Sequence, residues 1–383
     1  MVYKMTIEEI YKTSESLYNP FIEDWKKQGK KIMGYYCTYI PEEIMHAADV
    51  LGYRIRATES DGTSRADTIL SRFNCSFIRA TLDLVLEGKY QFLDGLACMN
   101  SCDHARRMYD IFKRKVFGEV EGYSPEFPLY YISVPHIITD HGYEWLKEEF
   151  EIFKSNIENA FGKNITNADL NNSIKVFNEN RQLLKDIHAL RILEKPKITG
   201  VEALKLNIAN TSVPKEIMNS NLKSYLNQLK DSDGISDYRA RILVLGSLID
   251  DPSFLKIIED VGGLIVSDML CFGTKNFWDL AEGGGEPLDS ITKRYYEKIS
   301  CPRMMDDNDR RFDFLYKQIQ AANVDGIIAT HIEFCDLHGC QNMIFENELE
   351  KINMPILSLD RDYFLGDVGR FKTRAEAFIE QIE

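Results

Sequence analysis

Two series of short apolar runs, each followed by segments with helical spacing, divide the chain. In the first series, residues 32–40, 90–98 and 129–135 are rich in β-branched and aromatic side chains, which favours strands. Residues 41–49 and 74–88 have the spacing and the N-terminal residues of helices. A repeated strand-then-helix order is typical of a parallel sheet with helices on both faces.

A second series of the same kind begins near residue 241. Residues 241–250, 264–268, 324–329 and 355–359 predict strands, and residues 374–379 predict a closing helix. We therefore expect an α/β fold in which two Rossmann-like, doubly wound parallel-sheet domains are joined by a helical segment. The expected boundaries are 1–30 for an N-terminal helical segment, 31–141 for the first domain, 142–234 for the helical connector and 235–383 for the second domain.

The connector and the N-terminal segment differ from the two series because they carry helical patterns alone. Residues 142–229 contain long helical patterns, and Thr166 and Asp169 are spaced as in a capping box. Residues 6–30 have apolar side chains at roughly helical spacing and predict one amphipathic helix.

Composition and charge limit the classes of function. The 46 Lys and Arg against 60 Asp and Glu give a net charge of −14, and no basic cluster offsets it, so nucleic acid is not an expected partner. No apolar run approaches the roughly 18 residues of a membrane span, and the first ten residues lack the apolar block of a secretory signal. We expect a cytoplasmic protein that does not enter a membrane.

The eight cysteines carry the most informative chemistry. Disulfides are not expected in a reducing compartment, and the absence of any CxxC pair disfavours zinc fingers and the ferredoxin motif. Five thiols fall near predicted junctions of strands with loops or helices: Cys37, Cys75, Cys102, Cys271 and Cys335. Such positions converge in a parallel sheet, so one interpretation is an iron–sulfur cluster assembled from scattered thiolates. The other is a set of unrelated buried thiols.

Several stretches in the same order along nearly the whole chain resemble the 2-hydroxyacyl-CoA dehydratase and benzoyl-CoA reductase family. They are residues 34–43, 86–95, 100–103, 173–181, 334–336 and 370–378. The resemblance implies two Rossmann-like domains with a 4Fe-4S cluster between them. It also implies that three Cys thiolates hold the cluster while one iron stays open to water, substrate or another ligand. The matching positions here are Cys75, Cys102 and Cys335.

The resemblance also implies the activity and the partners. Members of the family receive a low-potential electron from an ATP-hydrolysing iron–sulfur activator protein and pass it to an acyl-CoA thioester. The expected activity is that of a lyase, a 2-hydroxyacyl-CoA dehydratase, or of an oxidoreductase of the benzoyl-CoA reductase kind, in anaerobic metabolism. A homologous second subunit, or a second copy of this chain, is expected as a dimer partner. No bound flavin or nicotinamide is expected.

Three further thiols, Cys37, Cys271 and Cys301, leave an alternative open. Together with the first three they would suffice for an 8Fe-9S double-cubane cluster, as in family relatives that are homodimeric ATP-driven reductases of small molecules. The chain is similar to those relatives at residues 34–37 and 270–273, but it has Arg303 where they have the second Cys of a Cys-Pro-Cys motif. This departure favours the single 4Fe-4S cluster. A subunit that only relays electrons, without a substrate site, is a third possibility.

His46 is the candidate for a proton donor near the cluster, because it lies on the predicted helix after Cys37. The alternative is a histidine packed on a helix face. Cys98 and Cys340 are set aside as ligands.

Overall fold

Two four-stranded parallel sheets form the framework of the protein. A computed structural model describes residues 5–383. The first sheet has the order β2-β1-β3-β4 and the second the order β6-β5-β7-β8, so the two repeat one connectivity. The strands of the first sheet are β1 (Lys31–Tyr35), β2 (Val50–Arg54), β3 (Gly95–Met99) and β4 (Leu129–Ile132). Those of the second are β5 (Ala240–Gly246), β6 (Gly263–Met269), β7 (Gly326–Ile332) and β8 (Ile356–Arg361). The expected α/β class with two Rossmann-like units is confirmed.

Helices cover both faces of the first sheet because its strands bury side chains on both sides. On β1, Ile32 points into a core under α4 and α5, whereas Met33 and Tyr35 point into a second core under α3, α6, α7 and α12. The helices of this part are α2 (Pro20–Lys27), α3 (Glu42–Ala47), α4 (Ser76–Leu86) and α5 (Asp103–Ile111), with a 3-10 turn η1 (Ala66–Thr68) and a π-helical turn η2 (Phe112–Val116).

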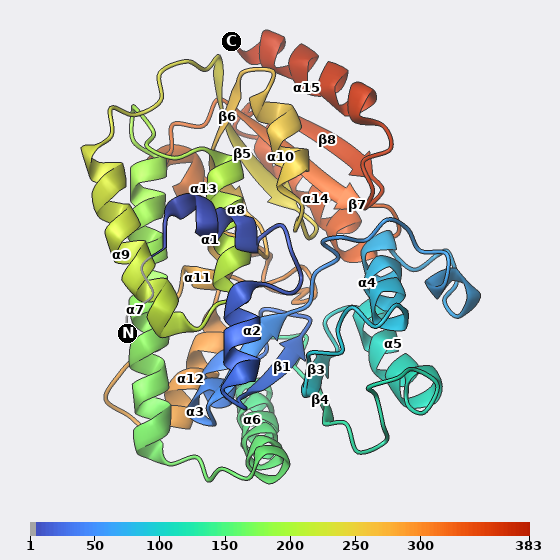
Figure 1. The fold of residues 1–383 in the computed structure, drawn as a ribbon. Helices are drawn as coiled ribbons and strands as arrows, with labels where there is room; N and C mark the ends of the chain where they lie inside the picture. The colour runs from blue at the N-terminus through green and yellow to red at the C-terminus, as the bar shows by residue number, and fades with distance from the viewer. Residues whose placement is uncertain (1–4) are drawn as a thin grey trace.

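The second sheet has the same layered construction. One of its faces packs against α8, α10 and α15, and the other packs against α13 and α14. In Figure 1 this sheet lies above the first, with α10 and α15 beside it. The helices of this part are α10 (Pro252–Glu259), α11 (Thr274–Phe277), α12 (Pro287–Glu297), α13 (Asn308–Ala321), α14 (Asp336–Glu350) and α15 (Val368–Ile382).

The expected helical segment between the sheets contains four helices. They are α6 (Asp140–Phe161), α7 (Asn167–Arg191), α8 (Gly200–Asn210) and α9 (Lys215–Asp231). In Figure 1, α7 and α9 run along the left side of the molecule, α8 lies beside the second sheet and α6 lies below the first. The capping box at the start of α7 is confirmed: Thr166 Oγ1 accepts from the Asp169 N–H at 3.2 Å, and the Thr166 N–H donates back to Asp169 Oδ2 at 2.9 Å. The exact boundaries between domains stay a prediction.

Three local predictions were wrong in their limits. Residues 6–30 form two helices, α1 (Ile7–Thr13) and α2, because Asn19 caps a new helix start with Pro20 at its first position. β1 ends at Tyr35, since the Ile40 N–H turns back to the Cys37 carbonyl at 3.1 Å. Likewise, residues 90–94 form a turn, and β3 begins only at Gly95. Strand β2 was not predicted.

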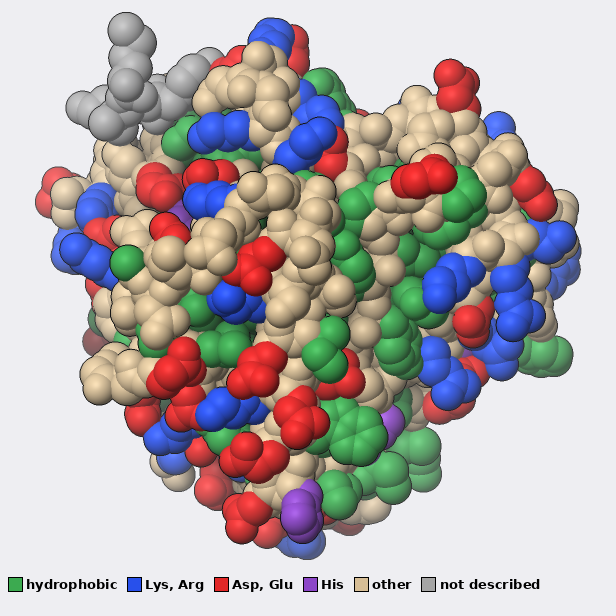
Figure 2. Space-filling model, turned by 90° about the horizontal axis from the view of Figure 1, so that it is seen from below, with side chains coloured by type: hydrophobic (Ala, Val, Ile, Leu, Met, Phe, Trp, Pro, Cys, Tyr) green, Lys and Arg blue, Asp and Glu red, His purple; other side chains and the backbone are tan. Residues whose placement is uncertain are grey.

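The surface reflects the acidic composition. On the face drawn in Figure 2, Asp and Glu side chains appear throughout, among Lys and Arg side chains, with hydrophobic side chains visible between them. Among the helices formed by residues 5–383, none is both long enough and apolar enough to cross a membrane.

Candidate functional site

Three cysteines predicted as ligands each occupy the residue that begins a helix. Cys75 precedes α4, Cys102 precedes α5 and Cys335 precedes α14. The free backbone N–H groups of a helix start point at such a residue, and the helix dipole there favours negative charge. The Cys102 Sγ accepts from the Ala105 N–H at 3.4 Å. The helix starts thus favour a thiolate at each position, although burial acts in the opposite direction.

These three cysteines line one pocket of about 460 Å³. Cys75 and Cys102 come from helices of the first sheet, and Cys335 comes from the helix that follows β7 of the second. We call this space the cysteine pocket; its other lining residues include Asn100, His104, His136, Arg303, Met305 and Asp336. The structure thus brings together the three residues that the sequence selected, although they lie up to 260 positions apart.

Local backbone features hold the three thiols in place. Phe334 has a positive φ of 67°, a left-handed conformation that a bulky residue rarely adopts, and it turns the chain so that the Cys335 N–H donates to the Ile332 carbonyl at 2.8 Å. The Cys75 N–H donates to His104 Nδ1 at 3.3 Å and so ties α4 to the start of α5. Asn100 binds both the N–H and the carbonyl of Val134, which fixes the loop before Cys102 to the end of β4.

The thiols influence one another's ionisation. Burial raises the pKa of Cys75 to about 11, and burial together with the Cys75 thiol raises the pKa of Cys102 to about 12. Burial raises the pKa of Cys335 as well, and Cys75, Cys102 and Cys301 raise it further. Mutual effects of this kind require short separations, so the thiols share one site.

Cys37, Cys271 and Cys301 lie next to this site. Burial raises the pKa of Cys301, with Cys271 and Cys37 as further causes, while the Lys275 ammonium opposes the increase. Cys301 and Cys37 also raise the pKa of Cys102. Electrostatic influence thus links Cys37 and Cys301 to Cys102, and Cys301 also to Cys335. Cys98, in contrast, is buried within β3, and Cys340 is exposed on α14.

Arg303 has a structural role at the edge of the cysteine pocket. It is 2% exposed, and its guanidinium donates to the carbonyls of Val134 at 2.6 Å, Pro135 at 2.8 Å and Asn100 at 3.3 Å. These carbonyls follow β3 and β4, where no strand neighbour can bind them. Arg303, at the position where the double-cubane relatives have a cysteine, thus hydrogen-bonds to the segments that follow β3 and β4.

The residues around the thiols fit an anionic iron–sulfur group. The cysteine pocket offers three thiols at helix starts, where backbone N–H groups favour an anion. Lys275 and Lys298 are buried but do not line this pocket: Lys275 acts on the Cys301 thiol, and Lys298 is influenced by Cys37 and Cys271. No three His, Cys, Asp or Glu side chains in residues 5–383 are grouped to hold a single metal ion. A cluster differs from a single ion because each thiolate binds an iron of its own.

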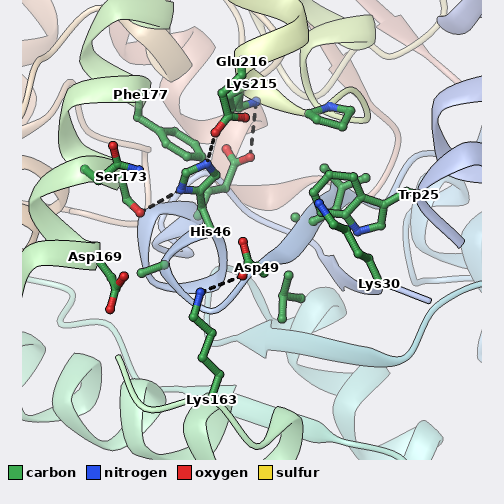
Figure 3. A pocket seen from close by; sticks show the side chains of 17 residues that line it. Trp25, Lys30, His46, Asp49, Lys163, Asp169, Ser173, Phe177, Lys215 and Glu216 are labelled. Carbon is green, nitrogen blue, oxygen red and sulfur yellow. Dashed lines mark hydrogen bonds and ion pairs between the residues drawn. The ribbon is translucent and has the colours of Figure 1, made fainter. Parts of the chain in front are cut away.

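His46 lies in a different pocket. Its Nδ1 is 2.8 Å from Ser173 Oγ on α7, and its Nε2 is 2.9 Å from Glu216 Oε1 on α9 (Figure 3). This histidine pocket, of about 240 Å³, is also lined by Trp25, Lys30, Asp49, Lys163 and Lys215, and no cysteine lines it. The structure does not bring His46 to the predicted ligands.

Sequence reasoning missed Tyr39 as a neighbour of the cysteines. The Tyr39 hydroxyl accepts from the Cys301 N–H at 3.3 Å, which joins the turn after β1 to the segment before α13. No local pattern marks Tyr39, because Cys301 lies 262 positions away.

Comparisons with known proteins identify the family of this chain. The family model for the D-component of 2-hydroxyglutaryl-CoA dehydratase matches residues 37–382. The chain is 25% identical to "Putative dehydratase subunit YjiM" of Escherichia coli (strain K12), over 94% of each chain. It is also 25% identical to a benzoyl-CoA reductase subunit of Thauera aromatica, over 99% of each chain, and 23% identical to the (R)-phenyllactyl-CoA dehydratase beta subunit of Clostridium sporogenes, over 93% of each. The chain belongs to the 2-hydroxyglutaryl-CoA dehydratase D-component family, among the subunits of 2-hydroxyacyl-CoA dehydratases and benzoyl-CoA reductases.

Proposed function

We propose that this chain is the iron–sulfur subunit of an activator-dependent 2-hydroxyacyl-CoA dehydratase or benzoyl-CoA-reductase-type enzyme that acts on an acyl-CoA thioester. The observation that carries the proposal is the convergence of Cys75, Cys102 and Cys335 on one pocket from helix starts of both sheets. Three thiolates would hold a 4Fe-4S cluster and leave one iron for a substrate or water. When bound, the cluster supplies low-potential one-electron chemistry.

The chain's own residues would hold the cluster and orient the substrate beside it. The backbone N–H groups of three helix starts would offset the negative charge of thiolates. Arg303 fixes the strand ends that carry the loop before Cys102. The pocket volume of about 460 Å³ admits the acyl end of a thioester but not a whole CoA molecule, so the nucleotide part would lie outside.

A specific observation favours a second candidate. Cys37, Cys271 and Cys301 adjoin the first three thiols, as an 8Fe-9S double-cubane cluster in a homodimeric reductase of small molecules would require. Against it, Arg303 is committed to three backbone carbonyls and leaves no thiol at its position. The single 4Fe-4S cluster is therefore the first candidate.

Iron analysis tests both candidates. The chain is reconstituted anaerobically with iron and sulfide, and bound iron and acid-labile sulfide are counted. About four irons per chain supports the first candidate and about eight the second. A chain that binds no iron, although correctly folded by circular dichroism, contradicts both.

Substrate and partners need separate measurements. Calorimetric binding of an acyl-CoA such as 2-hydroxyglutaryl-CoA to the loaded chain distinguishes an enzyme subunit from an electron-relay subunit, which should show none. Electron transfer that depends on ATP and on an added iron–sulfur activator tests the proposed donor. Light scattering, with the chain alone and with a homologous subunit, tests whether the partner is a second copy or a different chain.

A further inference from the structure

The surface that the cysteine pocket presents to a ligand is mostly apolar. Met305, in the turn before α13, lines the pocket and is 74% exposed, and Leu337 lines it from the first turn of α14. The loops before α4 and α14 meet beside the pocket, where the exposed rings of Phe73 and Phe334 lie nearly perpendicular with their centroids 5.6 Å apart. An apolar group in this pocket would therefore be removed from water by side chains of both halves of the protein.

The two arginines that line the pocket are already engaged. Each nitrogen of the buried Arg303 guanidinium donates to a backbone carbonyl. Arg106 binds Asp103 Oδ1 at 2.6 Å, and Arg107 binds the other oxygen of this carboxylate at 3.0 Å. No lysine lines the pocket. A carboxylate on a ligand would thus have to take an arginine from its present partner.

The two histidines of the pocket do not supply a cation. His104 accepts the Cys75 N–H at Nδ1, at 3.3 Å, so this ring nitrogen carries no proton and the ring is neutral. Burial and the Arg303 guanidinium lower the pKa of His136, which keeps this ring neutral as well.

Negative charge, in contrast, is available in the pocket. Asp336, the first residue of α14, lines it, and within residues 5–383 its carboxylate has no ion-pair partner within 4 Å. Thiolates at the three cysteines would add further negative charge. A second carboxylate on a ligand would therefore meet like charges without a free cation to offset them.

We propose that the cysteine pocket takes an uncharged, apolar acyl group and that Asp336 discriminates against acyl chains that end in a carboxylate. The inference rests on the acyl-CoA binding proposed above and narrows its substrate class. It assigns to Met305 and Leu337 the contact with the acyl chain, and to Asp336 the role of a specificity-determining residue.

The first test compares two ligands that differ in one group. The acyl chains of 2-hydroxypentanoyl-CoA and 2-hydroxyglutaryl-CoA have equal length, but the first ends in a methyl group and the second in a carboxylate. Calorimetry on the iron-loaded chain should give a Kd at least about ten-fold higher for 2-hydroxyglutaryl-CoA. Because the CoA part is common to both, its contacts cancel in the ratio. Equal Kd values, or tighter binding of 2-hydroxyglutaryl-CoA, overturn the inference.

The second test removes the charge of Asp336. Asp336→Asn should tighten binding of 2-hydroxyglutaryl-CoA at least about three-fold and leave that of 2-hydroxypentanoyl-CoA nearly unchanged, once iron analysis has confirmed the cluster beside it. Asp140→Asn is the matched control, because Asp140 is also an acid in the first turn of a helix but does not line the pocket. It should leave both Kd values unchanged. A ratio that Asp336→Asn does not alter overturns the role of Asp336.

The third test asks whether an arginine receives the distal carboxylate after all. Arg106→Gln should change the two Kd values by the same factor. If it weakens 2-hydroxyglutaryl-CoA selectively, Arg106 leaves Asp103 for the ligand and the inference is overturned.

These outcomes are distinct from a failure of the proposed function. Preferred binding of 2-hydroxyglutaryl-CoA by the iron-loaded chain overturns the substrate class and leaves the proposed acyl-CoA site standing. If the loaded chain binds neither ligand, the acyl-CoA site itself fails, and the substrate class falls with it.

Discussion

The cysteine pocket and the histidine pocket are built alike but differ in how their charges are satisfied. Both gather side chains from elements far apart in the sequence. In the histidine pocket the charged groups find partners within the protein: His46 binds Glu216, Lys163 binds Asp49 at 2.8 Å, and Lys215 binds Glu42. At the cysteine pocket, burial and the neighbouring thiols raise the pKa values of Cys102 and Cys335, so the thiols disfavour one another's ionisation.

This contrast separates the two pockets. In the histidine pocket, three charged side chains pair with carboxylates and Lys30 lies over the Trp25 ring at 4.1 Å, so its interactions can be explained as structure. In the cysteine pocket, burial and neighbouring thiols raise the thiol pKa values, so the thiols would lose their protons only when a positive group such as iron joins them.

The largest expected effect is a loss of bound iron, and it distinguishes two cysteines of α14: Cys335 at the start of the helix and Cys340 in its first turns. Cys335→Ala should lose the cluster, with iron after anaerobic reconstitution falling to background, because one of three proposed ligands is gone. Cys340→Ala, at an exposed position on α14, should retain the full iron content. Equal iron in both variants would show that Cys335 is no different from a surface thiol.

Arg303→Met should destabilise the metal-free protein by about 2–4 kcal/mol. The substitution leaves the carbonyls of Asn100, Val134 and Pro135 without this donor. Urea unfolding followed by circular dichroism measures the loss. Arg303→Lys, whose ammonium can still bind some of these carbonyls, should recover part of the lost stability. A decrease in the free energy of unfolding below about 0.5 kcal/mol would show that water replaces the guanidinium as donor and that Arg303 contributes little to stability.

His46→Gln should cost about 1–2 kcal/mol and leave the iron content unchanged. The buried Ser173 hydroxyl loses its partner, whereas the lost bond to the more exposed Glu216 contributes less. Urea unfolding and iron analysis on the same preparation check both statements. A changed cluster spectrum or reduction rate in this variant would instead support the sequence-based hypothesis that His46 donates protons near the cluster.

The smallest expected effect is a pH dependence confined to the histidine pocket. The hydrogen bond from His46 lowers the pKa of Glu216 below its ordinary 4.5. The folded state therefore holds this carboxylate ionised at pH values where the unfolded state is already protonated. Its contribution to stability is present above about pH 4.5 and is lost as the pH falls through the lower, folded-state pKa. Between about pH 6 and about pH 3, the free energy of unfolding should fall less steeply with pH in His46→Gln than in the wild type. An identical pH dependence in the two proteins would contradict the effect of His46 on Glu216.

Much of the fold could be predicted from short-range patterns. Apolar runs and helical spacing located seven of the eight strands in residues 5–383, and Thr166 and Asp169 marked the start of α7. The errors came where local composition and tertiary role disagree. Residues 36–40 and 90–94 are rich in apolar and aromatic side chains like a strand, but they form turns. Their buried hydrophobic side chains are Tyr36, Tyr39, Ile40, Tyr90, Phe92 and Leu93. Strand β2 has only five residues and an interior Gly52, which weakens its strand signal.

Local sequence patterns were enough for the α/β class and placed Cys75, Cys102 and Cys335 near junctions of strands with loops or helices, but they did not predict α14. The family resemblance selected these three cysteines as ligands. The folded chain was needed to show that all three line one pocket, that Arg303 binds the segments after β3 and β4, and that His46 lines a different pocket. The two kinds of information differ in range. Propensity and capping act within about one helical turn, whereas burial and charge depend on neighbours that only folding brings together.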